Sequence, residues 1–361
     1  MKLKSYKFRI YPNETQKILL GKTFGCTRFF WNYMTEVFNS QEKEFKTSTQ
    51  MRKEFDFLQE VSAGALQQKE MDFKEFKKQF FSKSRKVKIG RPKFKSRRYK
   101  QVYRLPNQKF KIVGNKIQLE KIGKVKIVLD REFPEIHRFI SVTVSMTTSK
   151  KYYVSIVVEQ EIESLKKTNK EVGIDVGVKT FIVQSDGIEV ANPKYFSKNQ
   201  AKLAKLQQYY SLKKKGSNRQ VKTRLKIAKL HRDIVRQRQH FIHNESIRLI
   251  RDYDRIFIED LDVKGMLESK LMSKEISDVS WSEFTRQLLY KADWYGKTVH
   301  KIDRYYASSK TCECGVKNNE LKLSDREWVC KSCGVINDRD ALASRNILKE
   351  GRRSLDDVTD T

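Results

Sequence analysis

Acidic side chains stand in apolar surroundings at separate places in the sequence. Asp175 lies inside one apolar run, Glu259 ends another, and Asp338 and Asp340 come just before a C-terminal helical segment. A buried carboxylate is costly without a partner. Three convergent carboxylates can hold two divalent cations about 3.5–4 Å apart for phosphodiester hydrolysis. The set therefore predicts a Mg²⁺ or Mn²⁺ site, although each acid taken singly could instead pair with a lysine or arginine.

A second group of candidate metal ligands is formed by cysteines. Four of the five cysteines fall within one C-terminal window, in a C-x-C and a C-x₂-C pair: Cys312, Cys314, Cys330 and Cys333. Four thiolates favour a closed, structural Zn²⁺ site. The first pair is one residue shorter than the usual spacing, so ligation by both of its thiolates stays open. The alternative is a group of reduced, unliganded thiols.

The charge of the chain points to a polyanionic partner. The sequence has 361 residues with 76 Lys+Arg against 44 Asp+Glu, a net charge of +32. So many positive charges repel one another in a compact fold, and nucleic acid relieves that repulsion. A merely basic surface and a membrane surface are the alternatives. No apolar run approaches the length of a membrane span, and the N-terminus lacks a signal-peptide core. A soluble cytoplasmic protein is the expectation.

Two segments concentrate this charge. Residues 85–100 hold nine Lys/Arg and no acid, with Phe94 and Tyr99 interleaved for base stacking. Residues 211–240 hold eleven Lys/Arg and one acid on a helical pattern. The nucleic-acid contacts predicted from these segments are Arg91, Lys93, Lys95, Arg97, Arg98, Lys213, Lys214, Arg224 and Arg236. A solvated charge run is the alternative for each segment.

Hydrophobic periodicity predicts the elements that position these residues. Residues 2–11 alternate as a strand, and several short strands follow over residues 102–160, which suggests one antiparallel barrel that is discontinuous in sequence. Residues 13–83 have helical spacing, and residues 199–250 favour a long helical hairpin. The acids fall on a first strand, at a later strand's end and on a C-terminal helix, an order that fits a ribonuclease-H-like α+β fold.

Several motifs, in this order, resemble the TnpB (OrfB) family of insertion-sequence transposons. They include Gly173-Ile174-Asp175-Val176-Gly177, Ile258-Glu259-Asp260-Leu261, Ser308-Ser309-Lys310-Thr311-Cys312 and Asp338-Arg339-Asp340. The resemblance covers nearly the whole chain. It implies an α+β multidomain protein with a RuvC-like nuclease core related to type V CRISPR effectors. That core would carry an inserted helical lid and a zinc finger, beside a wedge β-barrel interrupted by a helical recognition bundle.

The resemblance also implies an order of domains along the chain. The first wedge strand is expected at residues 1–11, the helical bundle with its basic loop at 12–100 and the remaining wedge at 101–165. The nuclease is expected at 170–309, with its lid at about 199–245, and the zinc finger that binds target nucleic acid at 310–335. The last nuclease motif is expected at 336–350 and a flexible tail at 351–361.

The same resemblance implies the chemistry and the partners. The catalytic, Mg²⁺-binding acids map onto Asp175, Glu259 and Asp340, with Asp340 preferred over Asp338. The implied activity is cleavage of double-stranded target DNA beside a short flanking motif, directed by a guide RNA from the transposon end. Gln67 and Gln68 resemble a family segment that could read adenine in that motif. A repressor without cleavage and a guide-independent nuclease are the alternatives.

The resemblance further implies a monomeric ribonucleoprotein that is functionally associated with the transposon's TnpA transposase. Its expected location is the bacterial or archaeal cytoplasm, in association with the nucleoid. Its expected role is in transposition and DNA recombination.

Overall fold

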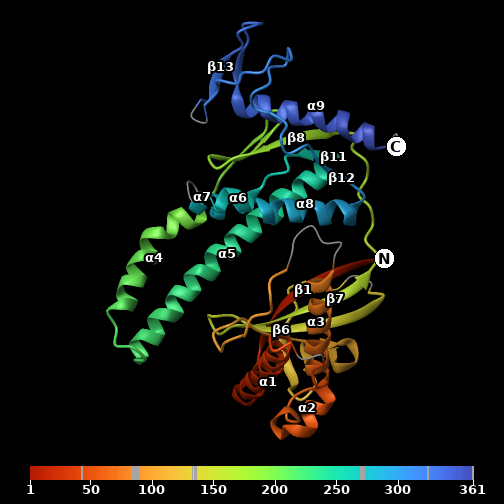
Figure 1. The fold of residues 1–361 in the computed structure, drawn as a ribbon, viewed down its shortest axis with the longest axis vertical. Coiled ribbons are helices and arrows are strands. Elements are labelled where there is room, and N and C mark those ends of the chain that lie inside the picture. Colours follow the sequence, from red (N-terminus) through yellow and green to blue (C-terminus); the bar gives the residue numbers. More distant parts are fainter. Residues whose placement is uncertain are drawn as a thin grey trace. The chain divides into compact units, whose positions relative to one another are not determined.

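The computed structural model describes residues 1–41, 44–82, 89–131, 133, 136–268, 273–322 and 325–359. The chain divides into two units, Met1–Glu161 and Ile162–Thr361 (Figure 1). Among the described residues, no helix is both long and apolar enough to cross a membrane.

The N-terminal unit is built on a seven-stranded antiparallel sheet. Its strand order is β2 (Gln101–Pro106), β6 (Arg138–Met146), β7 (Tyr152–Gln160), β1 (Lys2–Tyr11), β5 (Gly123–Val128), β4 (Lys116–Leu119) and β3 (Phe110–Val113). The first strand lies in the middle of the sheet, paired with β7 and β5. Phe110 near one end of the sheet contacts Phe139 on β6, with ring centroids 5.9 Å apart. The sheet thus nearly closes on itself, and its first strand comes from a distant part of the sequence.

Helices complete this unit between β1 and β2. They are α1 (Glu14–Asn39), α2 (Ser48–Glu54), the short 3₁₀ turn η1 (Asp56–Leu58) and α3 (Ala63–Phe81), with a second 3₁₀ turn, η2 (Asn107–Lys109), after β2. Pro12 follows the strand, and Asn13 caps α1 by accepting a hydrogen bond from the Gln16 amide. Phe30, Met34 and Phe73 lie in a core between the helices.

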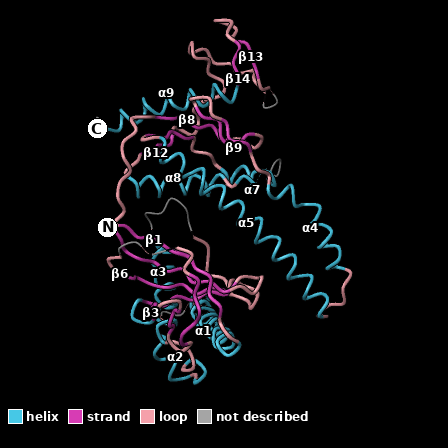
Figure 2. Tube along the Cα trace, turned by 180° about the vertical axis from the view of Figure 1, so that it is seen from behind, coloured by secondary structure: helices cyan, strands magenta, loops and turns pink. Residues whose placement is uncertain are grey.

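The C-terminal unit holds a five-stranded sheet between helices. Its strand order is β10 (Glu189–Ala191), β9 (Thr180–Gln184), β8 (Glu171–Val176), β11 (Arg255–Ile258) and β12 (Thr298–Lys301). Strand β9 is antiparallel to both β10 and β8, whereas β11 runs parallel to both β8 and β12. Helix α9 (Arg339–Thr359) covers one face, and α5 (Asn218–Asp252) and α8 (Trp281–Tyr295) lie on the other (Figures 1 and 2).

Other elements extend from this sheet. Helix α4 (Tyr195–Ser211) and α5 form a long hairpin that projects away from the sheet (Figure 1). The short helices α6 (Val263–Glu268) and α7 (Ser273–Val279) precede α8, and a two-stranded hairpin, β13 (Glu327–Val329) and β14 (Ile336–Asp338), precedes α9.

The predicted flexible tail at residues 351–361 is wrong for residues 351–359, because α9 continues through them to Thr359. Residues 360–361 lie outside the described residues. Gly351 lies inside this helix and is needed for close packing: a Cβ there would lie 2.2 Å from the Phe257 ring. Leu355 then packs against the buried cluster around Phe257 and Ile347. Gly173 has the same role on the strand side, since a Cβ there would lie 2.2 Å from the Ser344 carbonyl oxygen.

Candidate functional site

Two of the predicted acids lie side by side at the carboxyl ends of neighbouring strands. Strands β8 and β11 are parallel, and Ile174 pairs with Ile258 in their register. Asp175 is the next residue on β8, and Glu259 directly follows the end of β11. Neighbouring strands lie about 4.8 Å apart, so the register alone brings these two backbone positions together.

The pKa of Asp175 is affected by the charges of the other two predicted acids, so all three acids lie near one another. Burial, together with the charges of Glu259 and Asp340, raises the pKa of Asp175 to about 8. Burial also raises the pKa of Glu259, while a hydrogen bond from Ser308 opposes that rise. Strongly perturbed carboxyl groups are typical of catalytic and metal-binding sites.

The two aspartates before the C-terminal helix have different roles. Asp338 accepts a hydrogen bond from the Ala341 backbone amide at 2.8 Å and so caps the start of α9. Asp340, in the first turn, acts on the pKa of Asp175 and is 3.1 Å from the Arg326 guanidinium. The capping role of Asp338 and the proximity of Asp340 to Asp175 support the preference for Asp340.

A cavity of about 290 Å³ opens beside Glu259. Its lining includes Val176, Trp281, Arg286 and Lys301. The neighbouring acid Asp260 does not line this cavity. It forms ion pairs with Lys301 and Arg304, whose hydrogen bonds lower its pKa. Glu259 is thus the acid of this adjacent pair that lines a cavity.

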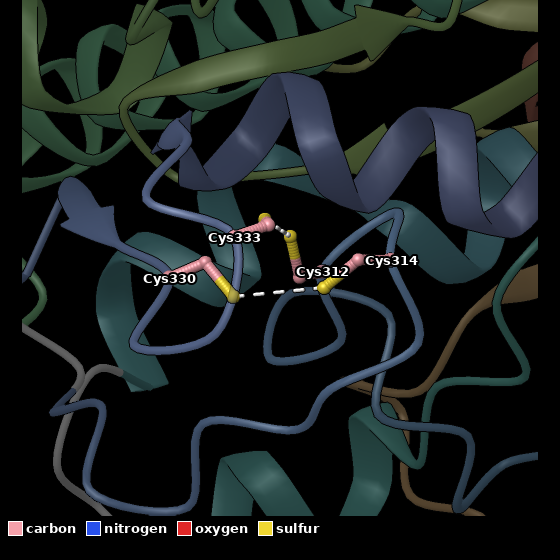
Figure 3. Close-up of side chains that lie close together, drawn as sticks. All are labelled: Cys312, Cys314, Cys330 and Cys333. Carbon is pink, nitrogen blue, oxygen red and sulfur yellow. Dashed lines mark hydrogen bonds between the residues drawn. The ribbon is translucent and has the colours of Figure 1, made fainter.

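The four predicted zinc ligands come together in the C-terminal unit. Figure 3 shows their side chains turned toward one another, and the four sulfur atoms lie within 4.8 Å of one another. The Sγ–Sγ distance is 3.7 Å from Cys312 to Cys333 and 3.6 Å from Cys314 to Cys330. Tetrahedral Zn–S bonds of about 2.3 Å imply sulfur separations of about 3.8 Å, so both members of the C-x-C pair fit zinc ligation.

Hydrogen bonds reach two of the sulfurs from outside the cysteine pairs' own thiols. Backbone amide hydrogen bonds from Cys333 and Ser332 lower the pKa of Cys330 to about 6. Asn337 donates its side-chain amide to Cys312 Sγ at 3.7 Å. The four sulfur atoms are thus close enough together to hold one metal ion.

The predicted basic loop is anchored to α1. Residues 85–88 lie outside the described residues. Asn32 forms two hydrogen bonds with the Lys95 backbone, at 2.7 and 3.0 Å, and Trp31 donates to the Lys93 carbonyl at 3.2 Å. The Lys95 ammonium lies 3.2 Å from the Trp31 ring centroid, and burial lowers its pKa to about 8. Lys95 thus packs against α1, whereas other charges of this loop are exposed: Arg91, Lys93, Arg97 and Arg98.

The remaining predicted contacts lie on helices or at their ends. Lys214, Arg224 and Arg236 are exposed on the α4–α5 hairpin, and Lys213 is half-buried at its bend. On α3, Gln67 is exposed, while Gln68 is half-buried and donates to Met71 Sδ at 3.5 Å.

Two features of the structure were not predicted from the sequence. One is Ser308, a buried residue that donates to Glu259 at 2.6 Å. The other is a basic face of the barrel, where Lys126 pairs with Lys116 across β5 and β4 and Tyr11 flanks Lys126 on β1. Like charges directly opposite destabilise a sheet, and neither lysine has an acidic partner among the described residues. Strand alternation gave a signal for exposed lysines, but not for which strands pair.

Comparison with known proteins gives the family. One family model, described as "Probable transposase", matches residues 155–270, and a Cas12f1-like TNB domain model matches residues 281–347. A protein of Streptomyces pristinaespiralis is 34% identical over 363 residues, which cover 96% of this chain and 89% of that protein. The chain belongs to the TnpB (OrfB) family. The Streptomyces relative is provisionally named an RNA-guided DNA endonuclease.

Other matches agree with TnpB membership. An Escherichia coli K12 protein, provisionally named RNA-guided DNA endonuclease InsQ, is 29% identical and is covered over 94% of its length. A solved Cas12f1–sgRNA–target DNA complex has the same overall fold, with a TM-score of 0.55 and 14% identity, over 96% of this chain and 98% of that one. A helix-turn-helix family model matches residues 1–42, yet the described part of this segment is the strand β1 followed by one long helix.

Proposed function

We propose that this TnpB-family chain is an RNA-guided DNA endonuclease with a RuvC-like active site. The observation that carries the proposal is the grouping of Asp175, Glu259 and Asp340 from β8, the end of β11 and the start of α9. The names of the two relatives that match over most of their length support the guide-dependent activity.

The three carboxylates would hold Mg²⁺ or Mn²⁺. Hard oxygen donors suit these ions, and ions bound there activate the attacking water and stabilise the leaving oxygen of a phosphodiester. Asp175 and Glu259 would face the scissile phosphate from the parallel strands, and Asp340 from the helix. The products would carry a 3′-hydroxyl and a 5′-phosphate. Because a proton on Asp175 competes with a cation, metal loading should favour its ionised form.

The basic surfaces would hold two nucleic acids. We assign a guide RNA made from the transposon end and a double-stranded target to the exposed cations of the 89–100 segment, the α4–α5 hairpin and the Lys116–Lys126 face. Gln67 is the better placed of the two glutamines for reading a flanking motif, because it is exposed. The four cysteines would hold one structural Zn²⁺ in a module that contacts the target.

The proposed division of labour follows the predicted segments. The barrel and helical bundle would bind the guide and the flanking motif, the α4–α5 hairpin would act as a lid, and residues 170–309 and 336–350 would form the nuclease. We further propose a monomeric ribonucleoprotein that acts with the TnpA transposase during transposition and associates with the nucleoid through its DNA target.

The guide dependence is tested by sequencing the RNA that co-purifies with the protein. A discrete RNA with a constant part and a variable end supports the proposal. Cleavage should then follow the variable end when it is replaced by a chosen sequence. Bulk cellular RNA together with plasmid cleavage by RNA-free protein would contradict guide dependence and indicate a guide-independent nuclease. Guide-directed DNA binding without cleavage in Mg²⁺ would indicate a repressor.

A further inference from the structure

Glu259 is held by a contact that the motifs did not reveal. The Ser308 hydroxyl donates to Glu259 Oε1 at 2.6 Å, a short, charge-assisted hydrogen bond. Ser308 is only 5% exposed, so water does not readily replace this contact. A serine hydroxyl has one proton to donate, and its use on Oε1 leaves Oε2 available to a cation.

Ser308 is itself fixed by the helix that carries Asp340. Asn346 of α9 donates its side-chain amide to the Ser308 carbonyl at 2.7 Å and to the Thr311 carbonyl at 2.6 Å. Asn346 is 3% exposed, and these two bonds use both of its amide protons. Thr311 directly precedes Cys312. The Asn346 side chain therefore links α9 to the segment that runs from Ser308 to the cysteine cluster.

We propose that Ser308 is a positioning residue for Glu259, and that Asn346 clamps the 308–311 segment so that the cysteine cluster and the acidic site are aligned together. The proposal rests on the proposed function, because it gives Glu259 a metal to bind. Ser308 sets which oxygen and which rotamer Glu259 presents. Asn346 links that geometry to the first thiolate of the zinc site and to the helix that starts beside Asp340. Partners that orient a metal ligand in this way typically change metal affinity 10–100-fold when lost.

The test measures divalent-cation affinity directly in the guide-loaded, full-length protein. Mn²⁺ is the probe, and bound Mn²⁺ is followed by its electron paramagnetic resonance signal during titration. The variants are Ser308→Ala, Ser308→Thr and Asn346→Ala, with Ser309→Ala as the matched control, since Ser309 is the adjacent serine and makes no such bond to Glu259. Zinc content and melting temperature are measured on the same samples.

Ser308→Ala is expected to weaken Mn²⁺ binding about 10-fold or more, with zinc content unchanged. Ser308→Thr, which keeps the hydroxyl, should remain within about 3-fold of the wild type on the same scale, and Ser309→Ala should match the wild type. Asn346→Ala should weaken Mn²⁺ binding and also speed zinc loss to a chelator. The Mg²⁺ concentration for half-maximal cleavage should rise in parallel.

Two results would overturn the positioning role: Mn²⁺ affinity of Ser308→Ala equal to wild type, or an equal loss in Ser308→Ala and Ser308→Thr. The clamp would be overturned if Asn346→Ala bound Mn²⁺ as tightly as the wild type and lost zinc to the chelator at the wild-type rate. If the wild type itself neither cleaves nor binds Mn²⁺ in a way that Asp175→Asn abolishes, the proposed function fails first. That outcome is distinct, because it appears before any Ser308 variant is compared.

Discussion

The cysteine cluster and the acidic site of the C-terminal unit differ in how their ligands are brought together. The cysteines come from one short stretch, and two turns, closed by hydrogen bonds from the Gly315 amide to the Cys312 carbonyl and from the Gly334 amide to the Cys330 carbonyl, bring the sulfurs within 4.8 Å. The acids come from two strands and a helix that are far apart in sequence.

The difference teaches what each site depends on. A local cluster of four thiolates leaves no coordination position open, so a metal bound there would support the fold of its own module. The acidic site depends on packing of the whole sheet, and burial with neighbouring charges raises the pKa of Asp175 to about 8. A site built in this way is unfavourable by itself and is suited to bind cations and substrate.

The largest expected effect is the loss of zinc from the cysteine cluster. Cys330→Ser should weaken zinc binding by more than about 100-fold, beyond the loss of an outer partner. It should also make residues 310–338 sensitive to protease. Metal analysis and limited proteolysis measure both. Cys26→Ala is the matched control, because Cys26 is buried in the helical core of the other unit. Full zinc retention by Cys330→Ser would remove the contrast with the acidic site.

Asp254 is a structural carboxylate, and its pKa is shifted in the opposite direction to that of Asp175. Burial alone would raise the pKa of Asp254, but hydrogen bonds from Lys297 and from the Thr168 and Asn169 amides hold it well below its usual range. The Lys297 side chain is 1% exposed. Asp254→Ala leaves that charge buried and unpaired, and should cost about 3 kcal/mol and lower the melting temperature by about 6–12 °C.

The pH dependence of this loss follows from the direction of the shift. A lowered native pKa means that Asp254 stabilises the fold above its unfolded pKa of about 3.9 and stops doing so as pH falls through the native value. The gap between wild type and Asp254→Ala, measured by thermal unfolding, should therefore be full at pH 7 and narrow below about pH 4. A gap that widens in acid would contradict this.

Asp175 should behave in the opposite way, with a smaller effect. Its native pKa is raised, so the ionised form destabilises the fold increasingly between about pH 4 and pH 8. In buffer without added divalent cations, Asp175→Asn should therefore stabilise the protein at pH 8, by on the order of 1–3 kcal/mol. The gain should shrink toward pH 4 and also when Mg²⁺ is added. Destabilisation by Asp175→Asn under all these conditions would mean that the carboxylate is a structural partner like Asp254.

Features of the fold and of the two sites that depend on local sequence pattern could be predicted from the sequence. The strand at residues 2–11 and the cysteine pairs can be recognised from alternation and spacing. The acids' positions on strand and helix could be predicted because a carboxylate in an apolar run is unusual. The capping role of Asp338 follows from its place before a helix, but the sequence alone left it beside Asp340 as an open choice.

The rest depends on contacts between distant segments. Ser308 follows no periodic pattern, and its bond to Glu259 spans 49 positions in the sequence. The missing Cβ of Gly351 makes room for the Phe257 ring within α9. Lys95 belongs to a basic run, but Trp31 and Asn32 hold it against α1. In each case the structure is decided by packing between segments that are distant in the sequence.

The most direct test of the acidic site compares two aspartates that are two residues apart. Asp340→Asn and Asp338→Asn are assayed for cleavage of guide-matched DNA in Mg²⁺ as guide-loaded proteins, with guide binding measured alongside. Asparagine still caps a helix, so Asp338→Asn should cleave within about 3-fold of wild type, because the cap changes by only a few tenths of a kcal/mol. Asp340→Asn should lose more than about 100-fold in cleavage rate while retaining guide binding. Cleavage retained by Asp340→Asn, or lost by Asp338→Asn alone, would contradict the assignment of the three acids.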